Sequence, residues 1–238
     1  VAIIGPNAAA PCFQGGTFAK ISVRPDLPTP EETIRARYAR ECEVLFAPGV
    51  DPAPRLPFMT VEPVKDIGDG ATAGMSLEYF ASSDFSGEPM TRETRDTNSL
   101  VWFTGMHDQA DFASGGSIRA SGMYRAQKDG EHRFHLGATG KARMLVDGKE
   151  IVATTSTPPG DTMGVLKSGD SEVATLSLSS GQTVEIVVEF PFEAARVHGL
   201  WYGIREPGSV EELLREAAAA AAKADAVFLL VGETSDSS

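Results

Sequence analysis

A short glycine-rich segment near the start of the chain is the first candidate for a ligand site. Gly15, Gly16 and Thr17 follow the apolar residues 1–4, which read as a buried strand. Loops beyond the carboxyl ends of parallel strands are where open α/β sheets bind their ligands. The same three residues also suit a plain glycine-rich turn, and the sequence leaves both interpretations open.

A second candidate is residues 154–172, TTSTPPGDTMGVLKSGDSE, which we expect to be the longest irregular stretch of the β-rich region. Long loops in compact domains are often functional. Two prolines stiffen its start. Met163, Val165 and Leu166 then give it an apolar tip, which is unfavourable on a surface unless something covers it. The alternative is a solvated loop without a ligand.

Other residue types that could do chemistry favour structural roles here. His132 and His135 are three apart on an expected strand, so they point to opposite faces and do not form a metal pair. Trp102 and Trp201 lie in apolar strands, which favours core packing over a sugar platform. The segment IIGPNAAA lacks the spacing of a dinucleotide-binding fingerprint.

Composition restricts the partners. The chain has 238 residues and a formal net charge of -12, and no basic run appears. Such a surface repels phosphate, so we expect neither nucleic acid nor an anionic membrane as partner. Cys12 follows the first expected strand and Cys42 precedes the second, so they lie at opposite ends of a parallel sheet. Because that separation is too long for a disulfide, we expect free thiols. The chain begins at Val1 in mid-strand, so we expect an excised piece, and its compartment stays unknown.

Both ends of the chain show α/β periodicity. Residues 1–50 read as strand, loop, helix and strand, and Thr29 with Glu32 forms a capping box around Pro30 at the start of the helix. Residues 207–238 read as a helix, with Ser209 and Glu212 as a second capping box, and then a buried strand. Such units are typical of a parallel sheet.

Between these ends the period changes to two. Prolines and glycines make residues 51–74 an expected linker. Residues 75–206 read as short antiparallel strands, with hairpin turns at Asp129-Gly130 and Asp147-Gly148. In residues 183–190 Val184, Ile186, Val188 and Phe190 share one face. We therefore expect α/β sandwich flanks with a parallel sheet, interrupted by an inserted antiparallel β-sandwich or barrel.

The flanking residues resemble glycoside hydrolase family 3. VAIIGPNA, GGTF, TPEE and VLFAPGVD resemble the start of the second domain of its β-glucosidases, and AAAAAAKADAVFLLVGETSDSS resembles the next helix and strand. The middle resembles the protective-antigen (PA14) domain that some members carry at this point. The segments on which this resemblance rests are SLEYFASSDFSGEP, GEHRFHLGATGKARMLVDGKEIV and LSSGQTVEI.

The resemblance implies a retaining β-glycosidase, acting on β-linked glucosides or oligosaccharides through two carboxylates. The family nucleophile lies on an N-terminal barrel domain absent from these residues. Glu233 and Asp236 match the approach to the acid/base glutamate and not that residue itself. We therefore expect no catalytic residue here, and an inactive chain on its own.

The resemblance also suggests substrate contacts. It implies that Gly16 and Thr17 lie beside the glucose pocket, with Thr17 offering a hydroxyl where many members have Ser. Asp236 belongs to the same expected pocket wall. The 154–172 loop would reach over the pocket mouth, but Val165 and Leu166 stand where an aromatic residue is frequent. That difference leaves steric closure as its expected role.

No cofactor or metal is expected. Calcium-dependent sugar-binding relatives of the inserted domain use adjacent Asp residues, and the sequence has no Asp-Asp pair. Three functions for the β region stay open: shaping substrate entry, acting as an independent carbohydrate-binding module, or serving as a spacer or oligomer contact.

Overall fold

The structure is a computed structural model of the chain. It describes residues 1–9, 27–50, 61–63, 74–95, 98–103, 106, 112, 114–155, 161–208 and 210–232. The chain divides into two compact units, residues 1–55 together with 208–238, and residues 56–207. Within the described ranges, no helix combines the length and the apolar character that a membrane span needs.

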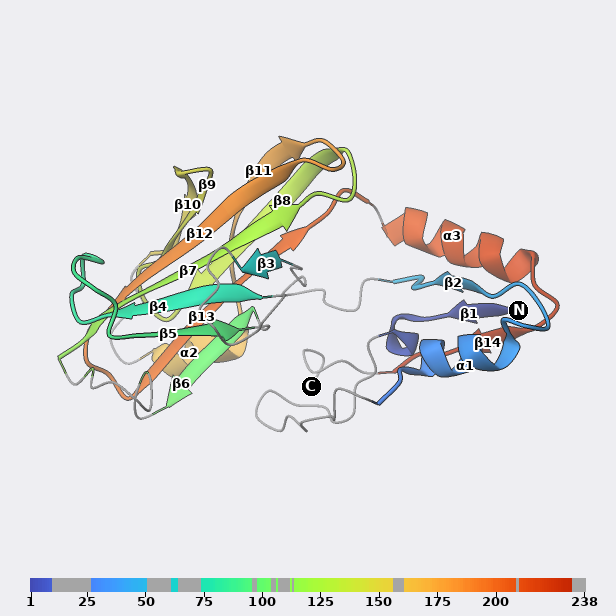
Figure 1. The fold of residues 1–238 in the computed structure, drawn as a ribbon, viewed down its shortest axis with the longest axis horizontal. Helices are drawn as coiled ribbons and strands as arrows, with labels where there is room; N and C mark the ends of the chain where they lie inside the picture. Colours follow the sequence, from blue (N-terminus) through green and yellow to red (C-terminus); the bar gives the residue numbers. More distant parts are fainter. Residues whose placement is uncertain are drawn as a thin grey trace. The chain divides into compact units, whose positions relative to one another are not determined.

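The first unit contains a parallel sheet in the order β14-β1-β2 (Figure 1). Its strands are β1 (Ala2–Ile4), β2 (Leu45–Ala47) and β14 (Val227–Leu229). β1 lies in the middle, because Ala2 pairs with Val227 on one side and with Leu45 on the other. The two ends of the chain therefore share one sheet, which confirms the predicted parallel α/β flanks.

Two helices and a short 3-10 turn, η1 (Pro6–Ala8), accompany this sheet. α1 (Pro30–Tyr38) begins at the predicted capping box, since the Thr29 side chain accepts from the Glu32 amide and the Glu32 carboxylate accepts from the Thr29 amide. α3 (Val210–Ala222) contributes Ala217 to a small core with residues of β1 and β2. Ser209, the expected cap of α3, lies outside the described residues. So does Cys12, whereas Cys42 is free and exposed.

The second unit contains two antiparallel sheets (Figure 1). The larger sheet has the order β10-β9-β12-β7-β4-β5, and β3 also pairs with β7. Its strands are β3 (Val61–Pro63), β4 (Met75–Phe80), β5 (Thr91–Arg95), β7 (Gly116–Arg125), β9 (Arg143–Val146), β10 (Lys149–Ala153) and β12 (Thr183–Phe192). The smaller sheet has the order β11-β8-β13-β6. Its strands are β6 (Ser99–Phe103), β8 (Gly130–Ala138), β11 (Glu172–Leu178) and β13 (Val197–Arg205).

The core of this unit consists of inward side chains from both sheets. The predicted alternation in β12 is confirmed, because its four expected inward residues are all buried in this core: Val184, Ile186, Val188 and Phe190. The β-sandwich expected for the middle of the chain is confirmed as well.

One predicted hairpin is right and the other is wrong. Asp147 and Gly148 have φ values of 49° and 76° and join β9 to β10, as expected of a turn with positive φ. Asp129-Gly130 instead leads from β7 in the larger sheet to β8 in the smaller one. The reason is that β7 already pairs with β12 on one edge and with β3 and β4 on the other, so no edge is free for β8.

The stretch expected as a linker also contributes to the sandwich. Within residues 51–74, Val61 pairs with Tyr124 of β7 and is 3% exposed. Its burial in the core explains why β3 forms next to so many prolines.

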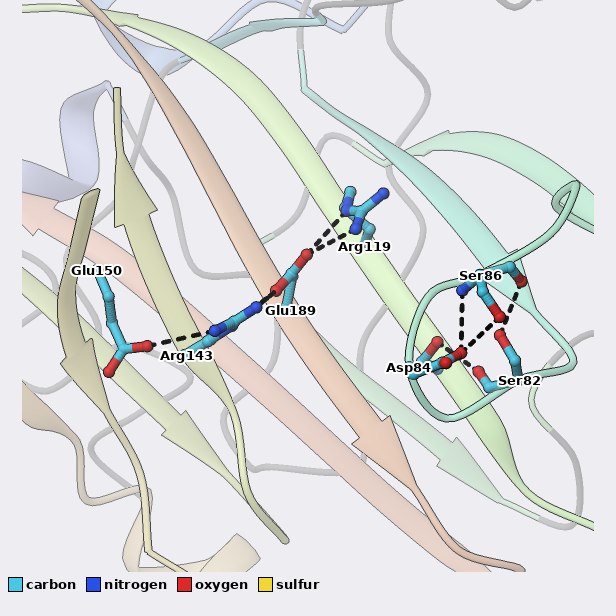
Figure 2. A network of polar contacts seen from close by, with 8 residues as sticks. Ser82, Asp84, Ser86, Arg119, Arg143, Glu150 and Glu189 are labelled. Carbon is cyan, nitrogen blue, oxygen red and sulfur yellow. Dashed lines mark hydrogen bonds and ion pairs between the residues drawn. The ribbon is translucent and has the colours of Figure 1, made fainter. Parts of the chain in front are cut away.

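A row of alternating charges crosses the outer face of the larger sheet. Glu189 of β12 pairs with Arg143 of β9 and Arg119 of β7, and its carboxylate contacts both guanidinium groups, at 2.6 and 2.7 Å (Figure 2). Glu78 of β4 continues the row between Arg119 and Arg92 of β5. We call these five residues the charge row. Its two carboxylates are nearly buried, so each depends on its arginines for compensation.

Candidate functional site

Residues 154–172 include a helix that the sequence did not predict. α2 (Thr162–Ser168) begins after Asp161, whose carbonyl accepts a hydrogen bond from the Val165 amide at 3.0 Å. It ends at Gly169, which has a φ of 61° and donates to the Val165 carbonyl at 3.1 Å. The expectation of irregular structure is wrong for these residues.

α2 is held on the outer face of β13 by residues that fit around glycines. A Cβ on Gly199 would lie 2.4 Å from the Leu166 Cδ2, so only glycine leaves room for this contact. Trp201, also on β13, covers Gly137 of β8. A Cβ added to Gly137 would lie 2.0 Å from the indole Nε1. The indole donates to the Asp170 carbonyl at 3.0 Å. The chain that follows α2 is thereby tied to β13.

Both tryptophans are packed, but the predicted core packing is right only for Trp102, because Trp201 packs on the outer face of β13. Trp201 is 4% exposed beneath the segment that follows α2, and Trp102 is 8% exposed in the core between the sheets. Neither offers an open ring face on which a sugar could stack.

Large apolar side chains remain exposed on this side of the smaller sheet. Met163 of α2 is 41% exposed, and Val101 and Phe103 of β6 are 43% and 50% exposed. Val101 pairs with Gly199, which seats Leu166, so β6 and α2 adjoin on the same face. We call Met163, Val101 and Phe103 the apolar rim.

Sequence reasoning found only part of the rim. It singled out Met163, together with Val165 and Leu166, which are half-buried because α2 turns them toward the sheet. It missed Val101 and Phe103. The signal was present in the segment LVWF, because Leu100 and Trp102 face the core and their neighbours must then face outward.

The two histidines of β8 lie on opposite faces, as predicted. His132 is fully buried on the core side. His135 is on the outer face, where its Nδ1 lies 3.1 Å from the Ser171 Oγ. Burial, and then the charges of Arg205 and Arg133, lower the pKa of His135. Among the described residues, no cluster of three or more histidine, cysteine or acidic side chains could hold a metal ion.

The other predicted contact residues cannot be placed. Gly16, Thr17 and Asp236, like Glu233, lie outside the described residues. The ends of their strands are described: the Leu230 amide donates to the Ile4 carbonyl at 2.8 Å. The Asn7 side chain lies 3.5 Å from where a Cβ of Gly232 would stand. The segments that lead toward these residues thus leave the sheet at the carboxyl ends of the neighbouring strands β1 and β14. The contact residues themselves stay predictions.

The second unit is recognised by comparison with known families. The PA14 domain family matches residues 72–199, which is more than half of the chain. The chain therefore belongs to the PA14 domain family.

Relatives that match both flanks and the insert are β-glucosidases. The chain is 29% identical to a β-glucosidase of Rhizobium radiobacter over 98% of this chain and 27% of the relative, and 29% identical to β-glucosidase B of Emericella nidulans over 99% and 28%. A crystal structure of a Kluyveromyces marxianus β-glucosidase superposes with a TM-score of 0.79 at 20% identity, covering 99% of this chain and 29% of that one.

The comparisons confirm the resemblance, in sequence and in fold, to a β-glucosidase segment with an inserted PA14 domain. The chain spans less than a third of the length of these relatives.

Proposed function

We propose that this chain serves as part of a β-glucosidase, in which the PA14 insertion shapes the entry of β-linked glucosides or oligosaccharides. The observation that carries this proposal is the continuity of the match. The relatives align over 98–99% of the chain, so flanks and insert occur together in enzymes of that name. The proposed division is an α/β part in residues 1–50 and 207–238, a linker in residues 51–74 that contributes β3 to the sheet of the insert, and the insert in residues 75–206.

The apolar rim is the part of the insert that we assign to substrate entry. Exposed apolar side chains on a soluble domain are unfavourable when they gather, and they commonly mark a surface that another surface covers. Leu166, seated on Gly199, and the bond from Trp201 to Asp170 hold α2 in place. The rim is thus a fixed obstacle, and a fixed obstacle near a pocket mouth rejects long substrates more than short ones.

An independent carbohydrate-binding module is the alternative. An aromatic platform would support it: Trp102 and Trp201 are both buried, whereas Phe103 of the rim is 50% exposed. We propose shaping of entry because flanks and insert align together in the relatives, with Met163 as the exposed residue of α2 and Val165 and Leu166 as its supports.

The test uses the proposed longer enzyme, with residues 159–169 replaced by a short Gly-Ser link. We expect kcat/KM for long cello-oligosaccharides to rise relative to cellobiose, while kcat for an aryl β-glucoside changes little. Lys167→Ala is the matched control, because it alters an exposed position of α2 and leaves Leu166 seated. A flat ratio of long to short substrates in a folded variant would favour the module or spacer alternative.

A further inference from the structure

The segment between α2 and β11 is held on the outer face of the smaller sheet at two successive residues. The Trp201 indole donates to the Asp170 carbonyl at 3.0 Å, and the His135 Nδ1 lies 3.1 Å from the Ser171 Oγ. Gly137 makes room for this arrangement, because a Cβ there would lie 2.5 Å from the same carbonyl. Since α2 ends shortly before these residues, the two bonds fix the carboxyl end of the helix.

The surroundings of His135 suit a neutral ring. A hydroxyl both donates and accepts, so the Ser171 Oγ can bond Nδ1 in either neutral tautomer. The other ring nitrogen, Nε2, is buried, and among the described residues it has no hydrogen-bond partner. In the imidazolium form both nitrogens carry a hydrogen, so a charged ring in this place would bury an unsatisfied donor.

The charges around His135 also oppose its protonation. Burial, and then the charges of Arg205 and Arg133, lower its pKa. Its strand partners Val173 and Gly203 are uncharged, and among the described residues no carboxylate pairs with the ring. The charged side chains of the elements around the ring are Glu131 and Arg133 on β8, Arg205 on β13, Lys167 on α2, and Asp170 and Glu172 beside Ser171. Glu172 pairs with Leu136, so its side chain leaves on the other face of the sheet.

We propose that His135 is a positioning residue of α2, which holds the helix while its ring is neutral and releases it when the ring is protonated. By turning away from Ser171, the charged ring gains water for Nε2 and distance from the two arginines. The stabilising effect is fully present above about pH 6.5, the ordinary pKa of histidine, and is lost as the pH falls through the lowered pKa.

The consequence for substrates rests on the proposed function, whereas the release of α2 does not. α2 carries Met163 of the apolar rim, so release makes the rim a less fixed obstacle. Length discrimination should therefore weaken toward acid pH.

The experiment follows hydrogen exchange of the Trp201 indole N–H by NMR in the 238-residue chain, because the bond to Asp170 protects this hydrogen. The parent and His135→Asn are compared at the same pH, which removes the intrinsic pH dependence of exchange. An amide can bond Ser171 and carries no charge. The ratio of the parent's rate to the variant's should rise severalfold between about pH 7.5 and about pH 5. The Trp102 indole, in the core, reports opening of the whole unit and should show no such rise.

Ser171→Ala removes the same bond without changing a titratable group. It should speed exchange of the Trp201 indole about fivefold at about pH 7.5, which is the factor expected for the loss of one neutral hydrogen bond. Ser177→Ala is the matched control, because Ser177 is an exposed serine on the same face of β11. It should exchange as the parent does.

The proposal is overturned if the ratio of the parent's rate to that of His135→Asn does not rise at acid pH, or if Ser171→Ala exchanges as slowly as the parent. Its failure is separable from failure of the proposed function. In the proposed longer enzyme, the ratio of kcat/KM for long to short substrates should rise toward acid pH, and His135→Asn should reduce that rise. A substrate ratio that ignores a measured release of α2 would contradict the entry role and leave the role of His135 standing.

Discussion

The contact between Leu166 and Gly199 shows how one missing side chain positions a helix. Without a Cβ at Gly199, the Leu166 methyl group reaches the backbone of β13, and α2 covers the strand that carries Trp201. A half-buried leucine gains stability from the apolar area that it removes from water.

Leu166→Ala should loosen α2 on the sheet. We expect a loss of about 1–2 kcal/mol in the free energy of unfolding, below the range for a fully buried leucine. We also expect stronger acrylamide quenching of the fluorescence, because water reaches Trp201. Met163→Ala serves as control, since an exposed position should change stability by less than about 0.5 kcal/mol. Equal quenching in both variants would contradict the seating of α2 through Leu166.

His198 should make stability depend on pH. It is 7% exposed and lies against Phe190 and Phe192, and burial lowers its pKa while a bond to the Ala195 backbone opposes the shift. The unfolded chain therefore takes up a proton below about pH 6.5 before the folded chain does. Stability is thus fully present above that pH and falls as the pH drops toward the folded pKa.

Urea unfolding at about pH 7.5 and about pH 5.5 checks this expectation. The parent should be less stable at the lower pH, and His198→Gln should show a smaller difference between the two conditions. An unchanged difference would mean that other groups cause the acid sensitivity.

At the scale of elements, the charge row couples five strands of the larger sheet. Glu189 is the residue on which two arginines converge, and its side chain is 6% exposed. Glu189→Ala should cost about 1.5 kcal/mol, because it removes charged hydrogen bonds to two arginines, and these side chains are 34% and 48% exposed, so solvent offsets part of the loss. Glu150→Ala is the matched control, since its carboxylate also contacts Arg143 but is 50% exposed. Similar losses in both variants would show that burial of Glu189 adds nothing.

Local signals explain which elements could be predicted. The capping box at Thr29 and Glu32 and the turn at Asp147-Gly148 depend on neighbours in sequence, and both were foreseen. α2 and β3 form through contacts with distant strands, which their own residues do not reveal. The same limit applies to the site: Met163 was visible as an apolar tip, whereas the rim exists only after α2 and β6 have come together on β13.

At the scale of the whole molecule, the account predicts that this chain alone does not hydrolyse aryl β-glucosides. A retaining glycosidase needs two carboxylates, and the family resemblance places both outside these residues. The measurement is turnover by the purified chain, with the longer enzyme as positive control. Turnover by the rigorously purified chain that resists a β-glucosidase-specific inactivator would contradict the predicted location of the carboxylates, whereas turnover that the inactivator abolishes is what a contaminating β-glucosidase would give.

Removal of the insert tests most directly whether it shapes substrate entry. In the longer enzyme, residues 75–206 are excised and a short Gly-Ser link joins the remaining segments, since β1, β2 and β14 pair among themselves. Turnover of an aryl β-glucoside reports whether the variant is folded and active. The ratio of kcat/KM for cellohexaose to that for cellobiose is then compared with the parent enzyme. The account predicts that this ratio rises severalfold, and an active variant with an unchanged ratio would contradict it.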